Sequence, residues 1–234
     1  MRKSLAVVMF LCSSLLAAQE VKPTNLSFLA VVGQTSPQQT AAFFNKGTTQ
    51  LSLTISVEGP FAIPVNDCGR GVKPGTHCNV FVTYTPAEIG QDTGLLTFNY
   101  GEGTAMVTLS GSGVSAIGTE LDDYSNFRDQ YRLGHGVNLE AKFFIDVDPK
   151  EGYDIPYGES VFFSCSNGSE TVNLGTSPIQ RACNKRHCPA PAHGKVESGF
   201  VPDQTGQWQC TATYPGDGVF GPTSTSWSFL IVAK

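Results

Sequence analysis

The sequence predicts an all-β protein built from two tandem β-sandwiches behind a cleaved leader. The 234 residues include 25 glycines, 14 prolines and 15 phenylalanines, a composition typical of many turns joined by aromatic strands. Short segments in which apolar and polar residues alternate recur between turn residues. The length that remains after a leader suits two domains of roughly 100 residues each.

Residues 1–18 are predicted to be a signal peptide. The basic start Arg2-Lys3 precedes an apolar run, and the small pair Ala17-Ala18 is suited to cleavage before Gln19. An uncleaved anchor and a lipoprotein acylated at Cys12 are the alternatives, but the run is short for a membrane span and Leu11 is too large for the lipoprotein motif. We expect an exported protein of the periplasm, the outer cell surface or the medium, with no transmembrane span in the mature chain.

The charge balance narrows the classes of partner. Loss of Arg2 and Lys3 from the 15 Lys and Arg residues leaves 13, against 20 Asp and Glu, so the mature net charge is −7. An acidic chain without a basic stripe argues against nucleic acid and against anionic membrane surfaces.

The cysteines predict disulfide bonds. Cys12 leaves with the leader, and the remaining six are an even number in an exported chain. Because Cys68 and Cys78 are alone in the first half, the domain boundary limits the pairings. The predicted bonds are Cys68–Cys78, Cys165–Cys210 and Cys183–Cys188.

The first domain is predicted over residues 22–114 as a sandwich of seven short strands. The clearest is Leu51–Val57, where apolar and polar residues alternate strictly. The other strands are expected at residues 26–32, 40–44, 61–63, 80–84, 96–100 and 106–109.

A pattern of turn residues and strand residues extends over 25–114. It consists of Cys68, Lys73-Pro74-Gly75, Cys78–Pro86, Gly90, Gly94–Leu96 and Leu109–Gly113. This pattern resembles the bacterial choice-of-anchor D domains and the similar ASPM/SPD-2/Hydin type of immunoglobulin-like (Ig-like) module. The resemblance implies an exported or surface module for packing and interaction, without catalytic residues.

The second domain is predicted over residues 119–234. Leu121, Tyr124, Phe127 and Tyr131 have helix-like spacing, which predicts one or two helical turns. One long strand is expected at residues 131–145, with a bulge at Gly134 and Gly136. Further strands are expected at 161–165, 172–174, 195–200, 206–214 and 224–232, with a loop over 176–195.

The stretch Asp203-x-x-Gly206-x-Trp208-x-Cys210 resembles the D-x-G-x-Y-x-C motif of immunoglobulin domains. It has one extra residue, and Trp208 replaces the usual tyrosine. The resemblance implies an Ig-like sandwich whose two sheets are tied by Cys165–Cys210. We expect Trp208 to take over core packing, and Trp227 on the last strand to lie in the core rather than to hold a ligand.

Three groups of residues in the second domain have side chains suited to binding. The set Cys183, His187, Cys188 and His193 has zinc-ligand chemistry, although a small-loop disulfide with exposed histidines is the preferred interpretation. The basic residues Arg181, Lys185, Arg186 and His187 form a candidate docking loop for an acidic partner or a glycan, or a solvated loop. The carboxylates Asp146, Asp148, Glu151 and Asp154 are weak calcium candidates, and a solvated turn is preferred.

The motifs of enzymes are missing from the sequence. It contains no G-x-S-x-G, H-E-x-x-H or phosphate-binding glycine loop, so we expect neither an enzyme nor a cofactor. The favoured hypothesis is a structural, adhesive or assembly protein that binds an unknown protein partner in the cell envelope, or a second copy of itself, through Ig-like domains. The alternatives are a two-domain periplasmic chaperone and a carbohydrate-binding accessory module, whose sugar-stacking residues would be Tyr124, Tyr131, Tyr153 and Tyr157.

Overall fold

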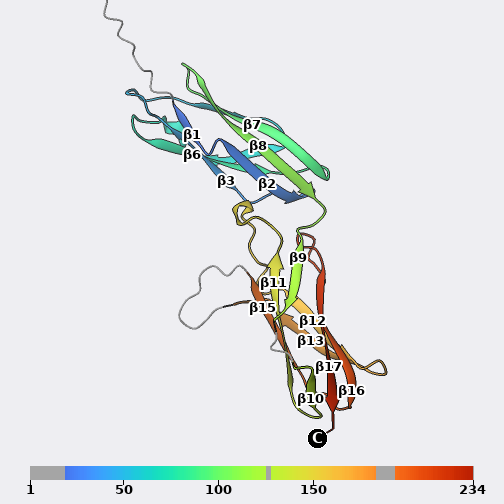
Figure 1. Cartoon of the computed structure of the whole chain (residues 1–234). Coiled ribbons are helices and arrows are strands. Elements are labelled where there is room, and N and C mark those ends of the chain that lie inside the picture. Colours follow the sequence, from blue (N-terminus) through green and yellow to red (C-terminus); the bar gives the residue numbers. More distant parts are fainter. Residues whose placement is uncertain (1–18, 125–127, 183–192, 234) are drawn as a thin grey trace, which may run out of the picture. The chain divides into compact units, whose positions relative to one another are not determined.

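The computed structural model describes residues 19–124, 128–182 and 193–233, which form strands, turns and two short 3-10 helices (Figure 1). These helices are η1 (Cys68–Arg70) and η2 (Pro149–Glu151). The prediction of an all-β protein is therefore confirmed. Within the described ranges, no helix is long and apolar enough to cross a membrane.

The described residues divide into two compact units. The first holds the residues up to Leu26 together with Gln39–Thr83 and Thr93–Ser110, and the second holds Ser27–Gln38, Tyr84–Asp92 and the residues from Gly111 onward. Several strands between residues 25 and 114 contribute to both units. The domain boundaries expected from the sequence, 22–114 and 119–234, follow a different division and stay a prediction.

The strands between residues 20 and 114 form two four-stranded sheets, with strand orders β1-β3-β6-β5 and β2-β8-β7-β4. Phe43 on β3 and Phe98 on β7 are fully buried, and their rings stack with centroids 5.6 Å apart. Since these strands belong to different sheets, the sheets pack face to face as a sandwich. The strands are β1 (Glu20–Lys22), β2 (Asn25–Val31), β3 (Gln39–Phe44), β4 (Thr54–Val57), β5 (Phe61–Asn66), β6 (His77–Tyr84), β7 (Gly90–Asn99) and β8 (Thr104–Val114).

The limits of most strands differ from the sequence prediction, and three of the differences have a clear physical reason. The alternation over 51–57 predicts one strand, whereas β4 begins at Thr54 and Leu51 forms an isolated bridge with Val72. The last strand continues past Leu109 because Gly111 lies so close to Tyr84 that an added Cβ would be 2.5 Å from its ring. Strand β1 is missing from the prediction, since three residues are too few to display a period of two.

The strands after residue 118 form two further sheets, with orders β14-β15-β11-β9 and β10-β17-β16-β12-β13 (Figure 1). The rings of Phe143 on β11 and Tyr214 on β16 meet edge to face at 5.0 Å, so these two sheets also pack face to face. The strands are β9 (Thr119–Asp123), β10 (Gln130–Arg132), β11 (Val137–Ile145), β12 (Ser160–Ser166), β13 (Thr171–Pro178), β14 (Gln180–Arg181), β15 (Gly194–Phe200), β16 (Gly206–Tyr214) and β17 (Thr223–Val232).

Two predictions for the start of this region are wrong. The helix-like spacing does not produce helical turns in the described residues, because Leu121 lies in strand β9 and Tyr131 in strand β10, while Phe127 lies outside the described residues. The long strand expected over 131–145 is divided, since β10 pairs in parallel with β17 whereas β11 begins only at Val137. Gly134, with a φ of 78°, turns the chain between them instead of forming a bulge in one strand.

The disulfide Cys165–Cys210 joins two neighbouring strands of one sheet. Strands β12 and β16 pair antiparallel with Cys165 opposite Cys210, and the two Cα atoms are 3.9 Å apart. The expectation that this bond ties the two sheets together is therefore wrong. Trp208, two residues earlier, is fully buried with its ring 4.8 Å from that of Phe200 on β15. Aromatic packing between β16 and β15 thus connects the sheets, as expected for Trp208.

Candidate functional site

An open groove beside β1 is the first candidate site. It has a volume of about 610 Å³ and is lined by residues 19–25 and by Thr104, Ala105 and Met106 at the start of β8. All of these residues belong to the first unit. The side chain of Met106 is half exposed, so an apolar group is accessible beside the groove.

The groove exists because the chain changes sheets at this point. Strand β2 runs beside β8, and at its start the N–H of Thr108 donates to the carbonyl of Thr24 at 3.0 Å. Before Thr24 the chain passes through the cis Lys22–Pro23 bond into β1, which pairs with β3 in the other sheet. Residues 104–107 of β8 therefore extend past the start of β2, and β1 is the edge strand of its own sheet.

The backbone of β8 faces this groove in a defined way. Along a strand, the N–H and C=O groups of alternate residues point to the same side. The Thr108 N–H points to the β2 side, so the N–H and C=O of Met106 point into the groove. Groups of this kind at a sheet edge are a template for the addition of another strand.

The charged side chains around the groove balance one another in part. The carboxylate of Glu20 lies 2.6 Å from the ammonium of Lys22 and 3.4 Å from that of Lys46. The hydrogen bond from Lys22 is the main cause that lowers the pKa of Glu20. Because these exposed charges are screened by salt, backbone hydrogen bonds and the Met106 side chain are the stronger means of recognition here.

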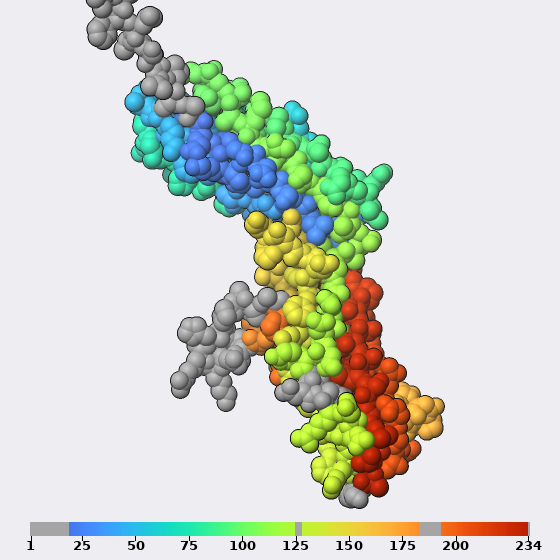
Figure 2. All heavy atoms as spheres, viewed as in Figure 1, coloured from blue at the N-terminus to red at the C-terminus, as the bar shows by residue number. Residues whose placement is uncertain are grey.

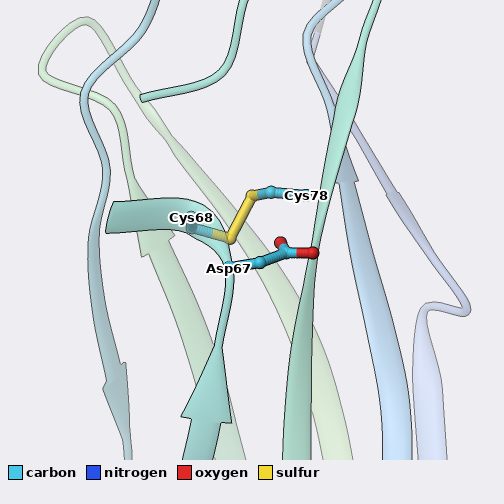
Figure 3. A group of neighbouring side chains, drawn as sticks. All are labelled: Asp67, Cys68 and Cys78. Carbon is cyan, nitrogen blue, oxygen red and sulfur yellow. A yellow bond between two sulfur atoms is a disulfide. The ribbon is translucent and has the colours of Figure 1, made fainter. Parts of the chain in front are cut away.

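A cluster of sulfur and carboxylate groups lies at the end of β5. In the described part of the chain it is the one group of histidine, cysteine or acidic residues whose ligand atoms lie within 4.8 Å of one another: Asp67, Cys68 and Cys78 (Figure 3). The two sulfurs form the predicted Cys68–Cys78 disulfide, and the carboxylate of Asp67 accepts the backbone N–H of Asn79. The cluster therefore fixes a turn, since disulfide sulfurs lack the thiolate that a metal would need.

The predicted docking loop is described only at its beginning. Arg181 is exposed, and its guanidinium lies 5.0 Å from the centre of the Tyr157 ring. Lys185, Arg186 and His187 lie outside the described residues, as do Cys183 and Cys188, so the bond predicted between these cysteines stays a prediction. Of the zinc-ligand set, only His193 is described; it contacts Phe144, and burial followed by nearby Lys142 lowers the pKa of its imidazole.

The four calcium candidates do not bring their oxygens together. Asp146, Asp148 and Asp154 are exposed, and the Asp148 carboxylate caps η2 by accepting the N–H of Lys150 at 2.9 Å. Glu151 is partly buried, and burial raises the pKa of its carboxyl. The carboxylates thus have separate local environments, which is the arrangement of a strand-end turn.

The tyrosines proposed to stack on sugars differ in accessibility. Tyr131 packs on Phe229 with ring centroids 5.4 Å apart, and Tyr153 packs on Phe220 at 6.3 Å. The ring of Tyr157 is beside Arg181. Only Tyr124 among the four is largely exposed, and the ammonium of Lys142 lies 3.3 Å from the centre of its ring.

Of the exposed large apolar residues, two that lie on candidate surfaces were not predicted from the sequence to be exposed: Met106 at the groove and Phe162 on β12. Phe162 could have been found from the sequence. Its neighbours Val161 and Phe163 are buried, so a period of two places Phe162 on the opposite face. The position of Met106 depends on the path of β1, for which the sequence contains no local signal.

No protein-family model matches the chain, and no curated protein matches it. Among solved structures, it is similar to the ASH/PapD-like domain 7 of human CEP192, with 16% identity over 50% of this chain and 99% of that chain and a TM-score of 0.34. It is also similar to a chimeric titin Z1Z2, with 13% identity over 92% and 96% of the two chains and a TM-score of 0.40. The D0-D1 domain of intimin matches with 12% identity over 91% and 97% and a TM-score of 0.26. Similarities of this extent carry no argument about function, and the resemblance to choice-of-anchor D domains stays a prediction.

Proposed function

We propose that the protein is an exported, non-catalytic binding protein of the cell envelope, which takes up an extended segment of a protein partner along the groove beside β1. The single observation that supports this is the open edge of β8. Residues 104–107 extend past β2, and their outward backbone groups line a groove whose other wall is the edge strand β1. An added strand would form main-chain hydrogen bonds with β8 and would cover Met106.

Export is supported by the leader-like sequence at residues 1–18 and by the two disulfides, which form in oxidising compartments. The periplasm and the outer surface are both compatible with this chemistry. A binding function is favoured over catalysis because strand addition needs only the backbone groups and the apolar contact that the groove supplies.

The test uses the mature protein from Gln19 and a displayed library of random ten-residue peptides. Selected peptides should bind wild type best and Met106→Thr less tightly, because threonine keeps the backbone N–H but loses the apolar contact. They should bind Met106→Pro more weakly than Met106→Thr, because proline also removes the N–H. One lost backbone hydrogen bond corresponds to roughly a fivefold change in Kd. Proline is tolerated at sheet edges, and a melting curve checks that the variant is folded.

The ligand side gives a second readout. Two versions of a selected peptide are compared, one N-methylated at the odd-numbered amides and one at the even-numbered amides. One version should lose binding and the other should keep it, because only alternate amides face β8. Failure to select any peptide, or equal binding of the two N-methylated versions, would refute strand addition at this edge. Light scattering with and without peptide tells whether a second copy of the chain competes for the groove.

A further inference from the structure

One sheet of the second unit lacks charged residues on four adjacent strands. Strands β12, β13, β16 and β17 contain no Asp, Glu, Lys, Arg or His, although charged residues make up 15% of the chain. The inward residues of β12 and β16 are buried, as expected for a sandwich core, whereas Val172 and Leu174 on β13 are partly buried. The outward residues of the four strands are not obliged to be neutral, because solvent accepts charges readily.

The opposite sheet of the same sandwich has a different outer surface. Lys195 on β15 lies 3.4 Å from Glu140 on β11 and 2.9 Å from Glu197. Lys142 on β11 is paired in register with Asp122 on β9. The charged residues of these strands thus lie mainly on this face, and Arg132 on the edge strand β10 is the one charged residue on the strands of the other sheet. The neutrality of β12, β13, β16 and β17 is therefore not a property of the whole unit.

The outer face of β13, β12, β16 and β17 consists mainly of hydroxyl and amide side chains, which are aligned in rows across the strands. Across β13, β12, β16 and β17, one row contains Thr176, Phe162, Thr213 and Ser224. Strands β16 and β17 lie side by side at the surface, in orange-red and red (Figure 2). The next two rows are Asn173, Ser164, Thr211 and Ser226, and then Thr171, Ser166, Gln209 and Ser228. With neighbouring strands about 4.8 Å apart, the four strands span roughly 14 Å.

Within these three rows, one large apolar side chain interrupts the polar surface. Phe162 is 50% exposed, and in its row it has Thr176 on one side and Thr213 on the other. An exposed aromatic ring offers a flat apolar face, while hydroxyl and amide groups on either side both donate and accept hydrogen bonds. This is the chemistry that suits a ligand with an apolar ring face bordered by hydroxyl groups.

We propose that this face, the Phe162 face, binds a neutral polysaccharide. A sugar ring would stack on Phe162, and its hydroxyls would exchange hydrogen bonds with the surrounding Ser, Thr, Asn and Gln side chains. The absence of charge over the four strands suits a neutral ligand and gives an anionic one no cationic partner. A protein partner fits less well, because serine and threonine are under-represented among the residues that dominate protein interfaces.

Co-sedimentation of the mature protein with insoluble cellulose, chitin and a β-1,3-glucan tests the proposal, and soluble alginate in affinity gels represents an anionic polysaccharide. Wild type should bind at least one neutral polysaccharide, and 0.5 M NaCl should leave that binding unchanged. Phe162→Ala should weaken it roughly tenfold, as expected for loss of a stacking contact. Val201→Ala is the matched control, since it removes an exposed apolar side chain from elsewhere in the same unit, and Tyr124→Ala tests the other exposed aromatic that could stack on a sugar.

Thr211→Glu places a charge in the middle of the Phe162 face and should abolish the binding, with a melting curve to check that the variant folds. The proposal is wrong if no neutral polysaccharide binds, if only alginate binds, or if Val201→Ala or Tyr124→Ala weakens binding as much as Phe162→Ala. It is also wrong if light scattering shows a dimer that Thr211→Glu dissociates, because the face would then join two copies. The peptide groove is in the first unit, so neither result depends on the other.

Discussion

Removal of the Cys165–Cys210 bond should destabilise the second unit far more than removal of Cys68–Cys78 affects it. The two bonds close segments of 45 and 10 residues. In the chain-entropy description, these lengths correspond to about 4 and about 2.7 kcal/mol of stabilisation through the unfolded state. Both Cys165 and Cys210 are also buried in the core, so replacing them by alanine adds the loss of sulfur packing.

The assay is urea unfolding of the mature protein followed by tryptophan fluorescence. The only two tryptophans, Trp208 and Trp227, belong to the second unit, so their emission reports on that unit. With an m value of about 1.5 kcal/mol/M, a loss of about 4 kcal/mol lowers the tryptophan midpoint by roughly 2–3 M urea. The double variant Cys165→Ala/Cys210→Ala should show this shift, and Cys68→Ala/Cys78→Ala should leave the tryptophan midpoint nearly unchanged.

Two results would refute this reasoning. The first is a shift below about 0.5 M urea for Cys165→Ala/Cys210→Ala. It would mean that contacts between β12 and β16 persist in the unfolded chain and restrict it even without the bond. Equal shifts for the two variants would mean that the two units unfold as one cooperative body. Circular dichroism of the same samples follows the strands of both units and separates these cases.

Two further predictions concern tight packing and a buried tyrosine. Gly111→Ala should lower the free energy of unfolding by about 1–3 kcal/mol, measured by thermal unfolding, because its Cβ would lie 2.5 Å from the Tyr84 ring. Gly199→Ala is the control: Gly199 has open space around it, so this variant should be within about 1 kcal/mol of wild type. Tyr214→Phe should lose about 1–2 kcal/mol at pH 7, since the Tyr214 hydroxyl donates to Glu159 at 2.6 Å. Burial, then that hydrogen bond, raises the pKa of Tyr214 above its usual value of 10.0. The contribution of Tyr214 to stability is therefore complete below pH 10 and is lost at higher pH. Between pH 10 and 12, the urea midpoint of Tyr214→Phe should fall less than that of wild type. Tyr124→Phe, which changes an exposed tyrosine, should behave as wild type.

The alternation of apolar and polar residues is sufficient to predict a strand that has one buried and one exposed face. In β16, Trp208, Cys210, Ala212 and Tyr214 are all buried while their neighbours face outward, so the period of two gives the whole strand. The same rule failed over 131–145, where the parity of the apolar residues continues across a turn. A glycine at positive φ turns the chain there without disturbing the sequence pattern.

Strand order could not be predicted because it depends on contacts between distant residues. The sequence identifies Cys165 and Cys210 as a pair, but it does not say whether their strands are neighbours in one sheet or face each other across the core. The candidate sites also differ in whether a local sequence pattern or a contact between distant residues determines them. Phe162 on the outer face is implied by its buried neighbours, whereas the groove at Met106 requires that β1 leave β2's sheet and pair with β3.

The three candidate surfaces rest on different forces, and ionic strength separates them. Strand addition at β8 uses backbone hydrogen bonds, and the Phe162 face uses stacking and neutral hydrogen bonds, so salt should alter neither affinity strongly. The docking loop that begins at exposed Arg181 would instead attract an acidic partner through its basic side chains, and such attraction weakens as the Debye length falls from about 10 Å at 0.1 M salt to about 3 Å at 1 M. A ligand of this protein that is lost between 0.1 and 1 M salt therefore belongs to the loop, and one that is retained belongs to the groove or to the Phe162 face, which Met106→Pro and Phe162→Ala then distinguish.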